Sequence, residues 1–492
     1  MIDVVFYFQV HQPYRLKKLL PTDKARRLDY WDTPLNKLVA ERVAERCYIP
    51  MNKVLLDAIE RTDGQFRCSF SLSGTVIRQL REWVPEALDT FVALAESGNV
   101  EFLCETSQHS LASIDHFEEF ADQVAIQKKT VTDLFGKPTS FRNTELIMDN
   151  GICKKVEDLG FDCMLGEGAD RLLDWRSPQV PYQPLGCQRL KLLLRSYSLS
   201  DDIAFRFSNR EWPEYPLFAD TFADWLHDVP PPAQFVGLFM DYETFGEHQN
   251  EQTGIFEFMR CLPDRVLEDK SFRFRTPAQV CSEREAVQEL NIDTHVSWAD
   301  EERNLSAWLG NPMQKAVHEK LYAMRSEVLL AGKKRPDLLA TWRDLTTSDH
   351  VYYIATKSHS DAEVHEYFSP YDHAHAAFVT VMTAIDGLRA EVQKCLAAPE
   401  VKVLPARAAA AANARPAQTS AVPKPAARKP AKAPAASKTA NAAGSSTKTG
   451  SGKAVPGNAS PAKVPTTKAP TKKAPTIKAP TPKAAGRRKK KL

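Results

Sequence analysis

Two acidic residues, Glu145 and Asp241, each follow a short apolar run that is typical of a buried strand. Asp241 comes directly after residues 235–240 (FVGLFM), and Glu145 closely follows residues 140–142. Parallel strands bring such positions together at the carboxyl edge of a sheet. Hydrolysis of a glycosidic bond requires this pair, one protonated carboxyl group and one ionised carboxylate. A structural alternative is that Asp241 caps the next helix and Glu145 is a solvated loop acid.

Other polar residues also follow predicted strands, and several could bind a sugar. They are His11, Glu105, His109, Glu167 and Glu243, with Arg142 and Asn143 just before Glu145. An imidazole could hydrogen-bond to sugar hydroxyl groups or hold a strand end in place. Arg142 and Asn143 could orient Glu145, bind hydroxyl groups, or make structural hydrogen bonds.

Two tryptophans near residue 300 are further candidates for sugar binding. Trp298 and Trp308, with Asp300 between them, offer flat apolar faces and a carboxylate acceptor that suit a pyranose ring. Tryptophan is also an ordinary core residue, so Trp308 in a helix could simply be packing.

An alternation of apolar runs and helical segments over residues 1–300 is typical of a parallel α/β protein. Candidate strands are Val4–Val10, Arg67–Leu72, Val100–Cys104, Ser140–Arg142, Phe161–Leu165, Leu192–Arg195, Phe235–Met240 and Phe272–Phe274. Helical periodicity lies between them, as over residues 76–96. Seven or eight such units predict a closed or nearly closed barrel, with its site at the carboxyl ends of the strands.

The remaining sequence predicts two further regions. Residues 301–400 carry helical segments such as 314–330 and 373–395 and no strand signal, so we expect a helical C-terminal region. Residues 401–492 hold 21 of the 65 Lys and Arg residues and none of the 62 Asp and Glu residues. This Ala/Pro/Lys-rich tail is predicted to be disordered. It could contact polyanions weakly or be a solubilising extension.

The cysteines and the apolar runs of the sequence indicate where the protein is located. Nine scattered cysteines form no CxxC pair, which argues against a disulfide scaffold or a zinc knuckle. The apolar run at 4–10 is too short for a signal peptide, and no stretch approaches the roughly 20 apolar residues that cross a bilayer. We therefore expect a cytoplasmic protein with no membrane contact.

Five segments, in order, resemble the five sequence regions of glycoside hydrolase family 57, particularly its α-amylase branch. They are FYFQVHQPYR, VEFLCETSQHSLAS, FRNTELIMDN, LFMDYETFGEHQ and VSWADEERNLSAWLGN. TSDHVYYIATK and VHEYFSPYD also resemble the C-terminal region of that branch. The resemblance covers about residues 1–385 and excludes the tail.

The resemblance implies an α/β fold with a (β/α)7-type barrel, a C-terminal helical bundle, and a retaining mechanism without metal or organic cofactor. The family's nucleophile falls on Glu145 and its acid/base on Asp241, while His11 and His109 match positions that line the pocket. Burial and nearby negative charge should then raise the pKa of Asp241. Asn304 stands where the fifth region commonly has an acidic residue, so sugar affinity there could differ.

The implied substrate is α-1,4-glucan, but several activities remain open. A covalent glycosyl-enzyme could pass its sugar to water, or to another glucan as in a 4-α-glucanotransferase or a branching enzyme. A metal-dependent deacetylase would need an HxxxH-like ligand set, which His365, His373 and His375 do not provide. A non-catalytic glucan-binding protein whose tail binds polyanions is the alternative from a different class.

Overall fold

The computed structural model of the protein describes residues 1–23, 28–357 and 369–398. Contacts divide the chain into two units, Met1–Val403 and Leu404–Leu492. The tail predicted at 401–492, together with its polyanion contact, lies outside the described residues, and a boundary at residue 300 stays a prediction. No helix within the described ranges is long and apolar enough to cross a membrane.

Seven parallel strands build the centre of the first unit. They are β1 (Ile2–Val10), β2 (Cys68–Leu72), β3 (Val100–Phe102), β4 (Ser140–Arg142), β5 (Cys163–Glu167), β7 (Lys191–Arg195) and β8 (Phe235–Asp241). One sheet has the order β3-β2-β1-β8, and β4-β5-β7 are neighbours in the other. A parallel bridge from Cys104 to Phe141 joins β3 to β4, and the Ser196 N–H donates to the Gly237 carbonyl (2.8 Å) between β7 and β8. This succession is compatible with the expected (β/α)7-type barrel.

Three short strands lie outside this succession. The eighth predicted strand, β9 (Phe272–Phe274), pairs with the first residues of β1. The other two, β6 (Tyr182–Pro184) and β10 (Gln288–Leu290), pair with each other, and β6 also pairs antiparallel with β7. Neither was predicted, because their sequences, YQP and QEL, contain no apolar run of the kind that marks the other strands.

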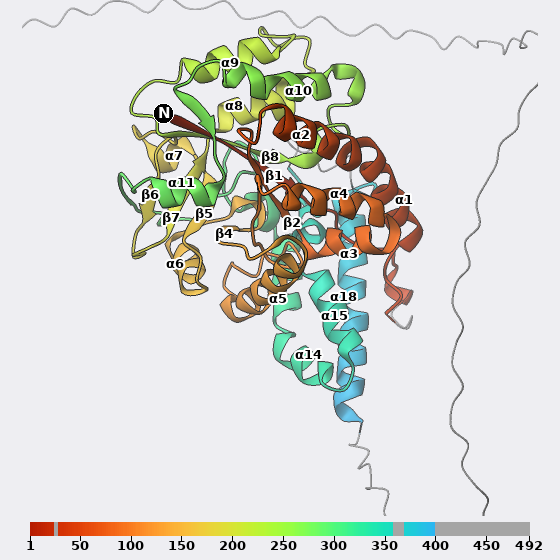
Figure 1. The fold of residues 1–492 in the computed structure, drawn as a ribbon. Coiled ribbons are helices and arrows are strands. Elements are labelled where there is room, and N and C mark those ends of the chain that lie inside the picture. The colour runs from red at the N-terminus through yellow and green to blue at the C-terminus, as the bar shows by residue number, and fades with distance from the viewer. Residues whose placement is uncertain (24–27, 358–368, 399–492) are drawn as a thin grey trace, which may run out of the picture. The chain divides into compact units, whose positions relative to one another are not determined.

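Helices surround the strands, with α1 to α4 on one side of β1 and β2 and with α6, α7 and α11 on the other (Figure 1). The helices of this part are α1 (Thr33–Val43), α2 (Ile49–Arg61), α3 (Gly74–Trp83), α4 (Pro85–Glu96), α5 (Phe117–Phe135), α6 (Asn150–Asp158), α7 (Asp170–Leu173), α8 (Tyr197–Asp201), α9 (Ala219–His227), α10 (Ile255–Val266) and α11 (Pro277–Glu283). The stretch of helical periodicity at 76–96 is helical on both sides of Val84. It is divided into α3 and α4 because Pro85 lacks an N–H and disfavours a helical residue before it.

Short turns of other helix types connect these elements. Two are π-helices, η2 (Ala44–Tyr48) and η4 (Asp202–Arg206), and four are 3₁₀ turns, η1 (Pro21–Asp23), η3 (Thr144–Leu146), η5 (Tyr242–Thr244) and η6 (Glu251–Thr253). Both η3 and η5 follow central strands directly. Glu145 lies within η3, and Asp241 is the last residue of β8, immediately before η5.

The described residues after 300 are helical. The helices are α12 (Ser306–Leu309), α13 (Pro312–Tyr322), α14 (Arg325–Gly332), α15 (Pro336–Leu345), α16 (Ser348–Tyr352) and α18 (Ala374–Ala397). In Figure 1, α18 runs beside α15, and it contacts α13, α14 and α15. The helix expected over 314–330 is interrupted where the Met324 N–H donates to Leu321, three residues earlier.

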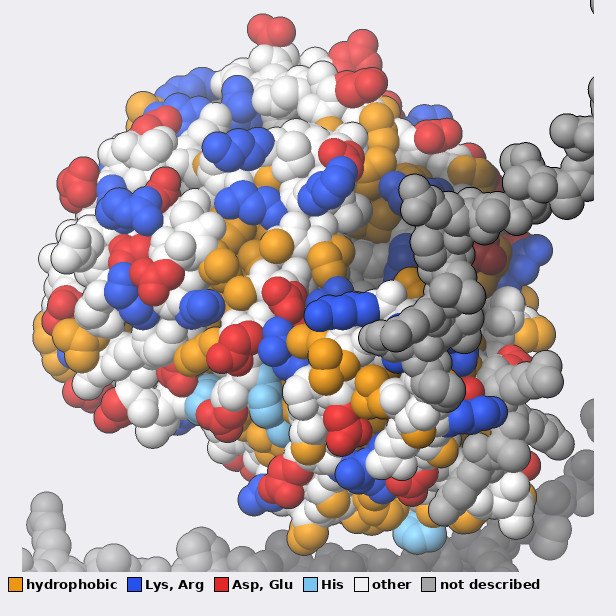
Figure 2. Space-filling view, turned by 90° about the horizontal axis from the view of Figure 1, so that it is seen from below, with side chains coloured by type: hydrophobic (Ala, Val, Ile, Leu, Met, Phe, Trp, Pro, Cys, Tyr) orange, Lys and Arg blue, Asp and Glu red, His pale blue; other side chains and the backbone are white. Residues whose placement is uncertain are grey.

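A small hydrophobic cluster is shared by the central strands. It gathers buried side chains from β1, β5, β7 and β8, including Val5, Tyr7, Leu165, Leu193 and Phe239. Larger clusters fill the spaces between strands and helices. On the face shown in Figure 2, acidic, basic and hydrophobic side chains are interspersed. The polar groups that could do chemistry lie at the ends of the central strands, next to this packed interior.

Candidate active site

Glu145 occupies a strained turn directly after β4. Its backbone is left-handed (φ 56°, ψ 27°), and Leu146 after it also has a positive φ of 51°. Such conformations cost of order 1–3 kcal/mol in residues other than glycine and cluster at functional sites. The Asn143 side-chain amide donates to Ser113 Oγ and to the Ile147 carbonyl, both at 2.8 Å. The described contacts of Asn143 therefore shape the turn that presents Glu145.

Both carboxylate oxygens of Glu145 have hydrogen-bond partners. Trp298 Nε1 donates to Oε2 at 2.6 Å, and His109 Nε2 lies 3.3 Å from Oε1. The Trp298 backbone N–H also donates to the Glu145 carbonyl at 3.2 Å. Donors to the charged form stabilise it, so this arrangement favours an ionised Glu145. With its side chain only 14% exposed, Glu145 is not the solvated loop acid of the structural alternative.

His109 is a buried cation between two carboxylates. Its Nδ1 lies 2.7 Å from Glu105 Oε2, opposite the nitrogen that faces Glu145. Burial alone would lower the pKa of His109, but Glu105 and then Glu145 outweigh burial and raise this pKa to about 9. For Glu105, burial acts to raise the pKa, and the His109 charge reverses that effect, so the net shift is downward. At neutral pH the ring is therefore an imidazolium beside Glu145.

Asp241, the last residue of β8, is held in its protonated form more strongly than an ordinary aspartate. Burial is the largest cause, the negative charge of Glu145 is the second, and together they raise the pKa of Asp241 to about 6. The cations of Arg142 and His109 act in the opposite direction. Its side chain makes no capping hydrogen bond to the following turn, so the capping alternative is wrong. The expected rise in pKa is confirmed.

Glu243 lies buried beside the acid. The Tyr48 hydroxyl, from the π-helix η2, donates to Glu243 Oε1 at 2.5 Å. Burial, followed by the charge of Asp241, raises the pKa of Glu243 to about 8. The carboxyl group is therefore largely protonated at pH 7. Its role in substrate binding stays a prediction.

Arg142 lies under Trp298 with its donors unused. The guanidinium carbon is 4.7 Å from the centre of the Trp298 ring, within the range of a cation–π contact. The side chain is fully buried, and within the described part of the chain none of its three nitrogens has a hydrogen-bond partner. Arg142 can therefore still donate to a water or a hydroxyl group.

A second ionic cluster stands at the ends of β5 and β7. Arg195 Nη1 lies 3.4 Å from Glu167 Oε2, and Arg303 Nε lies 3.6 Å from Oε1. Burial outweighs both cations and raises the pKa of Glu167 to about 7. Arg195 also lies 5.8 Å from the Trp298 ring centre, so this cluster borders the residue that holds Glu145.

Two predicted sugar ligands lie apart from this network. Trp308, in α12, is fully buried and meets Tyr352 edge to face at 6.1 Å between ring centres. Asp300 has a left-handed backbone (φ 56°) and faces Lys357 Nζ at 3.5 Å. The Asn304 side chain accepts from the Ser306 N–H at 2.7 Å. The described contacts give Trp308 a packing position, and sugar binding by Trp308 or Asp300 stays a prediction.

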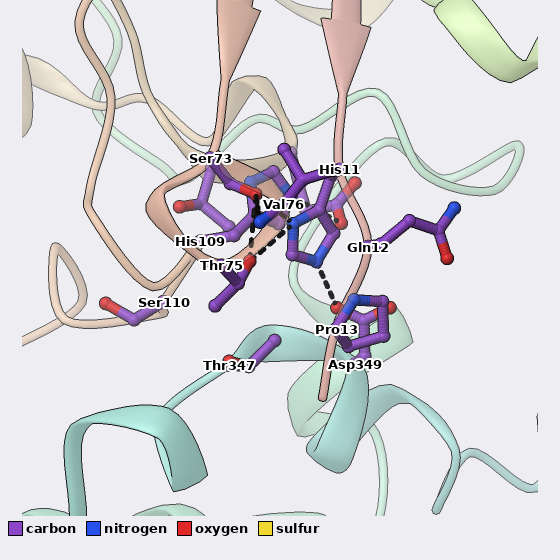
Figure 3. Close-up of polar contacts among 12 residues, drawn as sticks. His11, Gln12, Pro13, Ser73, Thr75, Val76, His109, Ser110, Thr347 and Asp349 are labelled. Carbon is purple, nitrogen blue, oxygen red and sulfur yellow. Dashed lines mark hydrogen bonds and ion pairs between the residues drawn. The ribbon is translucent and has the colours of Figure 1, made fainter. Parts of the chain in front are cut away.

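His11 is joined to a residue that the sequence did not single out. Its Nε2 lies 2.9 Å from Asp349 Oδ2, and its Nδ1 lies 2.7 Å from Ser73 Oγ (Figure 3). Asp349 stands in the segment TSDHVYYIATK, whose resemblance to the family was the one signal that could have pointed to it. Tyr48 and Arg195 were likewise missed, since neither lies in a recognised motif.

The described residues contain no candidate metal centre. Over 1–23, 28–357 and 369–398, no group of three or more His, Cys, Asp or Glu side chains is arranged to hold a metal ion. His365 lies outside these ranges.

The sequence of the chain matches a known protein family. The family model described as Glycosyl hydrolase family 57 matches residues 5–294. The chain belongs to this family. It is therefore a glycoside hydrolase, and the resemblance seen in the sequence is confirmed. A "Putative alpha-amylase" of Methanocaldococcus jannaschii is 40% identical over 409 residues, which cover 81% of this chain and 86% of the relative.

Solved structures of two enzymes share the fold of this family 57 protein. The 4-alpha-glucanotransferase from Thermococcus litoralis matches with a TM-score of 0.53 and 15% identity, over 71% of this chain and 56% of that one. This chain thus matches little more than half the length of the transferase. The family 57-type branching enzyme from Pyrococcus horikoshii matches with a TM-score of 0.54 and 13% identity, over 74% and 87%. At these identities the likeness concerns the fold.

Proposed function

We propose that this glycoside hydrolase cleaves α-1,4-linked glucan with retention of configuration, using Glu145 as nucleophile and Asp241 as general acid and base. The observation that carries the proposal is the difference in protonation that their surroundings favour: a protonated carboxyl group at Asp241 and an ionised one at Glu145. Asp241 has a pKa raised to about 6, whereas Glu145 receives donors on both oxygens. Environments that separate two such groups assign the acid and the nucleophile.

The reaction proceeds in two displacements. Asp241 gives its proton to the glycosidic oxygen while Glu145 attacks the anomeric carbon, and the bond to the leaving oxygen breaks. Asp241, now ionised, takes a proton from water as that water attacks the same carbon and releases Glu145 as a carboxylate. The His109 imidazolium and the Trp298 indole N–H keep Glu145 oriented for attack and receive it again when it leaves.

The substrate class rests on the family and on the alpha-amylase name of the 40% identical relative. Several side chains are proposed to bind the glucan, namely His11, His109, Arg142, Asn143, Glu243, Trp298, Asp300 and Trp308. Arg142 has the strongest support among them because its buried donors have no partner in the described chain. No metal or organic cofactor enters any step of this mechanism.

Transfer to a second glucan is the alternative outcome of the same chemistry. A glucan hydroxyl group can take the place of water in the second displacement, as in a 4-α-glucanotransferase or a branching enzyme. Enzymes of both names share this fold. Since Glu145 and Asp241 serve either acceptor, the distinction belongs to product analysis.

The test incubates the full chain with maltoheptaose and with amylose and resolves products and reducing ends over time. Glu145→Gln and Asp241→Asn are run beside wild type, with Asp133→Asn as a surface control because that carboxylate is 59% exposed. Short maltooligosaccharides, growing reducing ends and an initial α-anomer by NMR support retaining hydrolysis. Longer or branched products at constant reducing ends establish transfer. An untouched α-glucan refutes the substrate class and leaves a non-catalytic glucan-binding role.

A further inference from the structure

Both ring nitrogens of His11 are used by protein groups, although the residue was expected to bind sugar hydroxyls. Asp349 Oδ2 lies 2.9 Å from Nε2 and Ser73 Oγ lies 2.7 Å from Nδ1. Figure 3 shows His11 between these two partners, with His109 beside it. The His11 side chain is 11% exposed. The ring is therefore held from both ends.

The hydrogen bonds around Ser73 assign the tautomer of His11. Ser73 Oγ accepts the Val76 N–H at 3.3 Å as the N-cap of α3 and lies 2.9 Å from the Thr75 hydroxyl. When the Thr75 hydroxyl donates to Ser73 Oγ, the Ser73 proton is available for Nδ1 of His11. A carboxylate can only accept, so the other nitrogen must carry the proton that faces Asp349. The pattern is complete when His11 is neutral and protonated on Nε2.

The neutral His11 ring stacks on the charged ring of His109. The two ring centres are 4.1 Å apart and the planes differ by 20°. Burial, followed by the charge of His109, lowers the pKa of His11, while Asp349 opposes both effects. His109 in turn lies between Glu105 and Glu145. A rotation of His11 would remove one face of the packing that fixes the imidazolium.

Asp349 reaches this stack from outside the central strands. It lies in α16, and the neighbouring Ser348 N–H donates to the His109 carbonyl at 3.0 Å. Thr347 forms an antiparallel bridge with Ser110. One short segment of the C-terminal helices therefore contacts the backbone of His109 and the side chain of His11.

We propose that Asp349 is a positioning residue that fixes the tautomer and the plane of His11, and through the stacked His109 keeps the imidazolium aimed at Glu145. The inference rests on the proposed function for its kinetic test and on geometry alone for its spectroscopic test. Asp349 acts through His11 and has no assigned contact with sugar. Its removal should therefore lower kcat more than it raises KM.

The kinetic test compares Asp349→Ala with Asp349→Asn in the full chain. Alanine removes the acceptor, and we expect kcat on maltoheptaose to fall about 10- to 100-fold with KM changed less than about threefold. Asparagine keeps an acceptor oxygen and should restore kcat to within about fivefold of wild type. The control is Asp122→Asn. Asp122 on α5 accepts from Arg325 of α14 at 2.8 Å and so links the same regions without contacting either histidine. This control should keep the kcat of wild type.

The spectroscopic test observes the histidines directly by ¹H–¹⁵N correlation on ¹⁵N-histidine protein, with His11→Gln for assignment. Wild type should show His11 protonated on Nε2, and His109 titrating with a pKa near 9. The titratable groups that interact with His109 are Glu105, Glu145, Asp241, His11 and Asp349. Loss of the Asp349 charge should lower the pKa of His109, and Asp349→Ala should mix the tautomers of His11.

These readouts separate the possible outcomes. A wild-type kcat in Asp349→Ala, or unchanged His11 and His109 signals in that variant, overturns the positioning role. A loss of kcat equal to that of Asp122→Asn also overturns it, because both would then reflect docking of the helices. If wild type leaves every α-glucan untouched, the proposed function fails, and the nitrogen spectra still decide the role of Asp349.

Discussion

Asp241→Asn should stabilise the fold at alkaline pH while abolishing catalysis. The pKa of Asp241 is raised from 3.8 to about 6, chiefly by burial and then by Glu145. Each pKa unit corresponds to 1.36 kcal/mol, so ionised Asp241 destabilises the folded state by about 3 kcal/mol. The side chain retains some solvent contact, and we therefore expect about 2–3 kcal/mol. Asparagine removes this charge with almost no change in volume.

The sign of this effect depends on pH. The folded pKa lies above the unfolded one, so the protonated form stabilises the fold at low pH, and this stability is lost as pH rises through about 6. At pH 8 the variant should therefore exceed wild type by the full amount. At pH 4 Asp241 is protonated in the folded protein, and the difference should fall below about 1 kcal/mol.

The assay is urea unfolding of wild type and Asp241→Asn, followed by tryptophan fluorescence at pH 8 and pH 4. Asp133→Asn is the control, because this exposed carboxylate forms only a surface pair with Lys129. We expect this control to match wild type within about 0.5 kcal/mol at both pH values. Equal stability of wild type and Asp241→Asn at pH 8, or a difference that does not change with pH, would refute the assignment of Asp241 as a buried acid beside Glu145.

Three further predictions test other contacts. Trp298→Phe keeps an aromatic ring over Arg142 but loses the indole N–H that donates to Glu145 at 2.6 Å. The kcat on maltoheptaose should therefore fall about tenfold to a hundredfold. A wild-type kcat would contradict the role of this hydrogen bond. His109→Gln removes a cation that lowers the pKa of Asp241. The alkaline limb of the kcat/KM profile, near pH 6 in wild type, should therefore move to higher pH. A move to lower pH would contradict the effect of His109 on the pKa of Asp241. Gly246→Ala places a Cβ 2.0 Å from the Arg46 carbonyl oxygen at a φ of +111°, whereas the Cβ of Gly254→Ala, at a φ of +85°, meets nothing within 4 Å. Thermal unfolding should show a loss of stability on the order of 3–5 kcal/mol for Gly246→Ala and about 1–2 kcal/mol for Gly254→Ala. Equal losses would exclude the clash with Arg46.

Local patterns in the sequence were sufficient to predict the central strands. The apolar run at 235–240 ends abruptly in an acid, and the structure ends β8 at Asp241. Pro85 carried enough information to divide the helical stretch at 76–96, but the periodicity on either side obscured it. The strands β6 and β10 have no such pattern because YQP and QEL contain no apolar run.

Pairings across long stretches of chain could not be predicted from one sequence. Trp298 holds Glu145 across 153 positions, and Asp349 reaches His11 across 338. Such contacts depend on the tertiary packing of distant segments, which no local spacing encodes. His11 illustrates the consequence: its place after a strand predicted a position at the site, but no local pattern predicted Asp349 and Ser73 as the partners of its two nitrogens.

The distance along the chain between His11 and Asp349 also orders events during synthesis. His11 leaves the ribosome well before its carboxylate partner, which is added 338 residues later. At about 5–20 residues per second, that interval is roughly 17–70 s. Once Asp241 has been added, the nascent chain carries both the proposed nucleophile and the proposed acid but still lacks the segment that closes the histidine stack. Full activity should therefore begin only after α16 has emerged from the ribosome.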